Sequence, residues 1–183
     1  MERHLATAIL FSTLIWAGTC PAQDVYRAFS SPLHIKGVWN DLPVLAVTND
    51  TRVLLDYEKA TFEIAFDPGS LRTGVAALDS MFTAHGGSPI TLSGRLLGMN
   101  HIETKKHPPL DFDVEGRLSH MEQDGPIMGR GHLEHIFAGQ YACLLEVTFI
   151  VPVERFHLGT SLPGLSGDIT FHVVQTLLKR AND

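Results

Sequence analysis

The sequence predicts an all-β fold, an antiparallel sandwich or barrel with one short helix. Large apolar residues alternate with polar ones along several segments, residues 110–118 being the clearest, so each segment has one buried and one solvated face. A single solvated face favours antiparallel pairing, because parallel sheets are covered on both sides. Turn signals such as Asp67-Pro68-Gly69 separate the segments at the short spacing that is typical of sandwiches and barrels.

The predicted strands share this alternation and are bounded by Gly, Pro, Asn or Asp. In the last of them, Ile169, Phe171, Val173 and Leu177 fall on one side. In chain order, the segments are residues 33–39, 52–57, 61–66, 90–96, 110–118, 145–151 and 169–177.

One segment breaks the alternation and predicts a helix. Ser70, just ahead of it, is of a residue type that caps a first helical turn. We therefore expect a short helix over residues 71–83 that packs on the sheet. The apolar residues at helical spacing are Leu71, Val75, Leu78 and Phe82.

The first 22 residues predict export. Arg3 lies in a short polar start, a mostly apolar run covers residues 5–17, and small residues follow as far as Ala22. The run is shorter than the ~20 apolar residues of a transmembrane helix and is typical of a signal peptide. We expect cleavage after Ala22, one domain over residues 23–183 and a periplasmic or secreted location. No transmembrane segment is expected after cleavage.

Two alternatives for the leader stay open. An uncleaved apolar leader is one, and lipidation of Cys20 is the other. A lipoprotein signal usually has Leu three places before the cysteine and a very small residue directly before it. Ala17 and Thr19 occupy those positions here, so ordinary cleavage is preferred.

Charge and cysteine content narrow the function. The formal net charge is −6, with 14 Lys and Arg against 20 Asp and Glu, whereas nucleic-acid binding needs a concentrated basic face. Nucleic acid is therefore not an expected partner. Cleavage would leave Cys143 as the one cysteine, so no internal disulfide is possible. Its neighbours supply no base, and we expect it to be a buried structural residue.

Four stretches of the sequence share their order and spacing with one protein family. They are residues 66–79 (Phe66-Asp67-Pro68, Leu71-Arg72-Thr73-Gly74 and Leu78-Asp79), residues 101–112, residues 128–135, and residues 155–158 with residues 167–171. Together they resemble the YceI-like family of exported lipid- and polyisoprenoid-binding proteins. The sequence departs from that pattern at His107, where an aromatic residue is usual, and at residues 83–87, which replace a charged stretch.

This resemblance implies an extended eight-stranded antiparallel barrel, lipocalin-like, whose apolar interior holds an isoprenoid chain. A barrel of about eight strands has room for its own side chains or for one slender ligand. The same inward residues would build a packed core, and the sequence leaves a filled and a hollow barrel open. The residues expected to line the interior and bind the lipid are Phe62, Ile64, Phe66, Phe112, Val114, Val147, Phe149, Ile169, Phe171 and Val173.

Patterns of catalytic chemistry are weak. There is no Gly-x-Ser-x-Gly elbow and no phosphate-binding glycine loop. On a strand, His132 and Glu134 share a face but His132 and His135 do not, and a zinc site needs three or four ligands. No third ligand can be named.

We therefore expect a non-catalytic binding protein, not an enzyme, with no metal and no other cofactor. Its expected partner is an apolar lipid of isoprenoid type. One alternative is an interaction or stress-response barrel with a packed core and no lipid. A weaker alternative is a metal-dependent enzyme that uses its surface histidines. The sequence does not determine the oligomeric state.

Overall fold

The computed structural model describes residues 24–103, 108–138, 141–156 and 158–181. Over these residues the chain forms a closed barrel of eight antiparallel strands in sequential order, with β8 pairing back to β1. The predicted all-β antiparallel barrel is confirmed, and of the two architectures left open the sandwich is excluded. The expected signal peptide, its cleavage site after Ala22 and Cys20 all lie outside the described residues.

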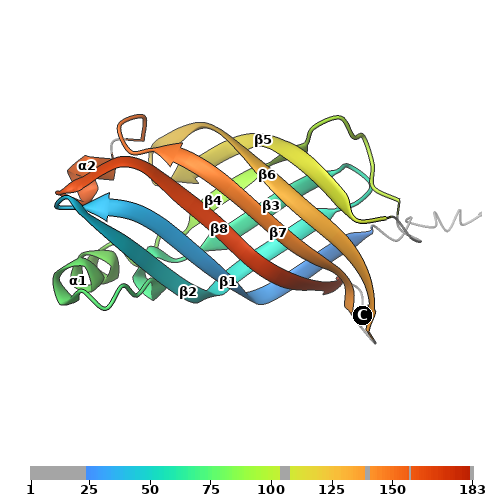
Figure 1. Ribbon diagram of the computed structural model, residues 1–183, viewed down its shortest axis with the longest axis horizontal. Coiled ribbons are helices and arrows are strands. Elements are labelled where there is room, and N and C mark those ends of the chain that lie inside the picture. Colours follow the sequence, from blue (N-terminus) through green and yellow to red (C-terminus); the bar gives the residue numbers. More distant parts are fainter. Residues whose placement is uncertain (1–23, 104–107, 139–140, 157, 182–183) are drawn as a thin grey trace, which may run out of the picture.

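The barrel is elongated, and its long strands wind steeply around it (Figure 1). Two helices, α1 and α2, lie at the end where β1 turns into β2, which we name the helix end. At the opposite end β1 begins and β8 finishes, and we name it the Asp24 end. The strands are β1 (Val25–Trp39), β2 (Leu42–Asp56), β3 (Thr61–Phe66), β4 (Ile90–Leu96), β5 (Leu110–His120), β6 (Gln123–Ala138), β7 (Tyr141–Pro152) and β8 (Leu165–Arg180). The helical elements are η1 (Pro68–Ser70), α1 (Ala76–Ala84) and α2 (Leu158–Ser161).

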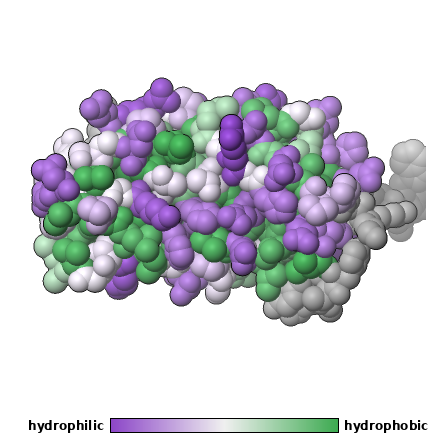
Figure 2. Space-filling view, in the orientation of Figure 1, coloured by the Kyte–Doolittle hydropathy of each residue, from purple (hydrophilic) through white to green (hydrophobic). Residues whose placement is uncertain are grey.

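Hydrophilic and hydrophobic side chains are mixed over the face of the barrel that Figure 2 shows. None of the helices within the described residues is long and apolar enough to span a membrane.

The predicted helix over residues 71–83 is wrong at its start. Leu71 has extended backbone, and Arg72 exchanges two backbone hydrogen bonds of 2.9 Å with Val47 of β2. The helix α1 therefore begins only at Ala76. Ser70 does not cap it, because its hydroxyl donates to the carbonyl oxygen of Asp67 at 2.7 Å.

The expected inward face of the last strand is wrong at Leu177. A bulge at Gln175, whose φ is 38°, adds one residue to β8. The bulge shifts the alternation, so Thr176 and Leu178 face inward and are 2% and 0% exposed. Leu177 is 44% exposed and faces outward.

Glycines on β6 make room for aromatic rings inside the barrel. A Cβ atom on Gly131 would lie 2.4 Å from the ring of Phe112, and one on Gly129 would lie 2.7 Å from the ring of Phe149. Because these glycines occupy positions where an alternating strand would have large apolar residues, the sequence pattern does not predict β6. The sequence analysis therefore did not include β6 among its predicted strands, although it considered a strand at residues 132–135.

We expect substitution of Gly131 by alanine to destabilise the barrel by about 1–3 kcal/mol, because the new methyl group overlaps the Phe112 ring. Urea unfolding of the variant measures this loss. Gly37→Ala is the matched control, since a Cβ there meets its nearest neighbour at 3.6 Å, an ordinary contact. In the double variant, Phe112→Leu replaces the opposing ring by a smaller side chain and should restore part of the lost stability. Equal stability of Gly131→Ala and the wild type would contradict this account.

Candidate functional site

All ten residues predicted to line the interior are buried. Their side chains are 0–7% exposed and belong to one contiguous hydrophobic core. The alternation of strands β3, β5, β7 and β8 directs them inward. Their contact with a lipid stays a prediction. The sequence analysis missed buried partners that do not belong to the clearest strand patterns, such as Val53, Leu55 and Leu133.

Aromatic rings pack against one another inside the barrel. The centroids of Phe62 and Phe149 are 5.5 Å apart, and those of Phe66 and Phe171 are 6.0 Å apart. Separations of this size are typical of packed aromatic pairs. A long apolar chain therefore fits along the axis only if some of these side chains change rotamer.

An apolar cavity of about 70 Å³ lies at the helix end, between the barrel and its two helices. Ile169 and Phe171 are the two predicted residues that line it, and Thr73 is the one polar side chain in its wall. Ligand pockets for drug-sized molecules are usually about 300–1,000 Å³, so this cavity by itself holds only a short apolar group. Its wall comprises Ile35, Gly37, Val44, Ala46, Leu71, Thr73, Leu78, Phe82, Ile90, Leu158, Leu162, Leu165, Ile169 and Phe171.

The helical elements η1, α1 and α2 form a cover over this cavity. Two aspartates within residues 66–79 hold η1 and α1 in place through hydrogen bonds. Asp67 accepts hydrogen bonds from the backbone N–H groups of Gly69 (2.8 Å) and Gly87 (3.0 Å), and so joins η1 to the turn after α1. Asp79 accepts from both the hydroxyl and the N–H of Thr73, each at 2.7 Å. The Thr73 hydroxyl is the first cause that holds the pKa of Asp79 below its ordinary value. The start of α1 is thereby tied to the segment that lines the cavity.

Tyrosines close the interior at the Asp24 end. The rings of Tyr26 and Tyr57 are 4.3 Å apart, and Tyr57 is 0% exposed. Burial raises the pKa of the Tyr57 hydroxyl well above its ordinary value, and burial raises the pKa of the Cys143 thiol to about 11. Both groups are neutral at pH 7. Cys143 is buried, as predicted.

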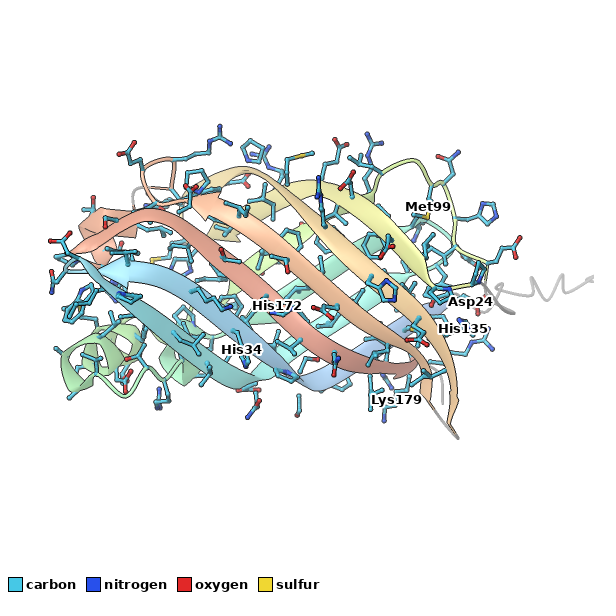
Figure 3. The ribbon with its side chains drawn as sticks, viewed as in Figure 1. Asp24, His34, Met99, His135, His172 and Lys179 are labelled. Atoms are coloured by element: carbon cyan, nitrogen blue, oxygen red, sulfur yellow. The ribbon has the colours of Figure 1, made fainter. Side chains whose placement is uncertain are left out.

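Two histidines of the outer surface form pairs with acids. His132 Nδ1 lies 2.7 Å from Asp111 Oδ1, and His172 Nε2 lies 2.7 Å from Glu146 Oε1. His34 and His172 lie side by side on β1 and β8 (Figure 3), with ring centroids 6.4 Å apart. Within the described ranges, no group of three or more His, Cys, Asp or Glu side chains is arranged to hold a metal ion.

No family model matches the sequence, and no curated protein matches it. The structure is similar to that of a polyisoprenoid binding domain from Saccharophagus degradans implicated in plant cell wall breakdown. The TM-score is 0.64 at 11% identity, and the match covers 86% of this chain and 99% of that one. It is also similar to Burkholderia cenocepacia BcnA, with a TM-score of 0.51 at 12% identity over 79% of this chain and 96% of that one. These two similarities confirm the YceI-like fold that the sequence resemblance implied.

Replacement of Asp79 by alanine should loosen the cover and lower stability by about 1–3 kcal/mol at pH 7, because two hydrogen bonds to a charged acceptor are lost. The folded-state pKa of Asp79 is lowered, so its contribution is present above the unfolded value of 3.8 and is lost as pH falls through the folded-state value. Urea unfolding at pH 7 and pH 3 measures both effects. Asp113→Ala, which removes an exposed ion pair with Arg130, is the control and should cost little. A gap between Asp79→Ala and the wild type that widens toward pH 3 would contradict this role.

Cys143 should resist thiol reagents while the protein is folded. In a Cys20→Ser variant it is the one remaining thiol, and with a pKa of about 11 only about 0.1% is ionised at pH 8. Its folded-state pKa lies above the ordinary value of 9.0, so its contribution to stability is present below pH 9 and is lost as pH rises through about 11. Labelling with a chromogenic disulfide at pH 8, with and without denaturant, tests this expectation. Fast labelling of the folded protein would show that the thiol is accessible.

Proposed function

We propose that this chain is an exported, non-catalytic protein that holds an apolar lipid of polyisoprenoid type inside its barrel. The observation that carries this proposal is the cavity at the helix end. Its wall is apolar apart from Thr73, and it adjoins the same core that contains the ten predicted residues. A site of this composition favours a ligand that offers hydrocarbon rather than charge.

Desolvation supplies the binding free energy in this proposal. Burial of hydrocarbon contributes roughly 0.8 kcal/mol per CH₂, so one five-carbon unit contributes about 3–4 kcal/mol before ordering costs. A few such units suffice for tight binding without a hydrogen bond. Because the axis holds packed rings, the chain has to displace Phe62, Phe149 or their neighbours as it extends from the cavity.

Similarity to the Saccharophagus degradans domain, which is described as polyisoprenoid binding, supports this ligand class. At the helix end, α2 is the weaker part of the cover, since none of its four residues is buried. The helix α1, in contrast, is tied down by Asp67 and Asp79. The α2 side of the cover is therefore the part that yields most readily as a chain fills the cavity.

A second candidate function is a packed barrel that acts through its outer surface. The aromatic pairs inside the barrel and the small volume of the cavity favour it. This candidate predicts that the folded protein carries no lipid and gains none from an apolar probe.

We expect protein purified gently from producing cells to carry a lipid that native mass spectrometry and solvent extraction detect. Gly37 lines the cavity, and a Cβ there would lie 3.6 Å from the Leu165 side chain, so Gly37→Val adds a side chain to the cavity wall and should reduce bound lipid severalfold. Lys36→Val, the exposed neighbour on the same strand, is the control and should bind as the wild type does. The intact mass also reports whether cleavage after Ala22 has occurred. Folded protein that is repeatedly free of lipid would favour the packed barrel instead.

A further inference from the structure

The barrel closes between β1 and β8, and this seam is incomplete. Tyr26 pairs with Arg180 and Arg27 with Lys179, but the next pair is Leu33 with Val173. Residues 28–32 of β1 and residues 174–178 of β8 therefore have no partner across the seam. A closed barrel normally leaves no such edge.

Both strands diverge at the seam because of local irregularities. Register shifts flank Ser31 in the pairing of β1 with β2, and the bulge at Gln175 distorts β8. Pro32 has no N–H group to donate across the gap. Each segment stays attached to its other neighbour, since Ser31 pairs with Thr51 and Thr176 pairs with Leu145.

A cavity of about 480 Å³ lies at this gap and connects surface residues with buried ones. Phe29 and Leu177 at its rim are 53% and 44% exposed, whereas Ser31 and Thr176 in its wall are 1% and 2% exposed. The residues of its wall are Arg27, Ala28, Phe29, Ser30, Ser31, Pro32, Gln175, Thr176, Leu177 and Lys179. Lys179 lies toward the Asp24 end of the barrel in Figure 3.

Buried hydrogen-bonding groups without partners gather at this gap. The hydroxyl oxygens of Ser31 and Thr176 have no hydrogen-bond partner in the part of the chain that the structure describes, and neither has that of Thr51, which faces Ser31 across the β1–β2 pair. The Nε atom of Arg27 is also buried and has no hydrogen-bond partner among the described residues. Buried polar groups are nearly always hydrogen-bonded, so four such atoms in one region indicate a missing acceptor.

The charges at the gap indicate what that acceptor is. Arg27 and Lys179 are cationic, and no acidic residue lines this cavity. The Arg27 guanidinium lies 5.3 Å from the Phe29 ring centroid, so apolar and cationic surface adjoin at the rim. Hydroxyl, guanidinium and ammonium groups all donate hydrogen bonds, and together they match an anion with several acceptor oxygens.

We propose that the seam between β1 and β8 is a side entrance that binds the anionic, oxygen-bearing head of an amphiphile whose apolar chain enters the barrel. The inference rests on the proposed lipid-binding function and adds to it the chemistry of the head group. A phosphate and a carboxylate share this chemistry. A β-strand from another protein matches the gap less well, because Pro32 and the Gln175 bulge interrupt the edge that it would pair with.

Binding assays with three ligands of similar chain length test this proposal: a prenyl monophosphate, the matching prenyl alcohol and a fatty acid. We expect an anionic ligand to bind about tenfold or more tightly than the alcohol, as hydrogen bonds to a charged group imply. The ranking of the monophosphate and the fatty acid identifies the head group. Thr176→Val and Ser31→Ala should each remove most of this preference, and Lys179→Met should weaken anion binding without changing alcohol binding.

The matched control is Thr170→Val, the same change on the same strand, at a residue that pairs with Lys36 and Ile150 away from the gap. It should leave all three affinities unchanged. Thermal unfolding of the ligand-free variants provides a second measurement. Since Thr176→Val removes an unpartnered buried hydroxyl, its melting temperature should equal or exceed that of the wild type.

The outcomes separate this inference from the proposed function. Equal affinity for the alcohol and both anionic ligands, unchanged by the variants, would overturn the side entrance and leave lipid binding intact. A variant that weakens all three ligands equally would also overturn it, because the hydroxyls would then not recognise the head. Absence of binding by every ligand would overturn both proposals.

Discussion

Because the strands close into a barrel, every second side chain of each strand is directed into one shared interior. This constraint decides which residues must be large and which must be small. Phe112 on β5 and Phe149 on β7 project toward β6 from either side, and glycines at positions 129 and 131 leave the space for their rings. The aromatic residues on β5 and β7 and the glycines on β6 therefore depend on one another, because each ring needs the space that a glycine leaves.

Local alternation predicted the fold well where a strand is regular. The bounds of β3 and β4 agree with the segments predicted from the sequence, since each follows period two without a bulge. The pattern failed where inward positions hold glycine, as on β6, and where a bulge changes the face, as at Gln175 on β8. The start of α1 could not be foreseen, because the backbone pairing of Arg72 with Val47 joins residues distant in the sequence.

The candidate site was also predictable only in part, because its wall joins residues that are distant in the sequence. All ten predicted residues are buried, yet only Ile169 and Phe171 reach the cavity at the helix end. The rest of its wall combines separate strands with the two helices that cover them. Which inward side chains meet a cavity depends on how that cover sits, and Asp67 and Asp79 determine its position through hydrogen bonds to backbone N–H groups.

The seam between β1 and β8 distinguishes the two accounts of the interior. A barrel that only needs to be packed has no use for a buried hydroxyl at Thr176, since valine has the same shape and suits a strand equally well. Each buried donor without a partner costs about 1–3 kcal/mol, and Ser31, Thr51 and Thr176 together lie in one region. The aromatic pairs are compatible with either account, whereas a ligand with acceptor oxygens at the seam, as proposed above, would account for these hydroxyls. In the proposed complex, the hydrocarbon chain of the ligand packs against the apolar core, and its head oxygens accept hydrogen bonds from the hydroxyls of the seam.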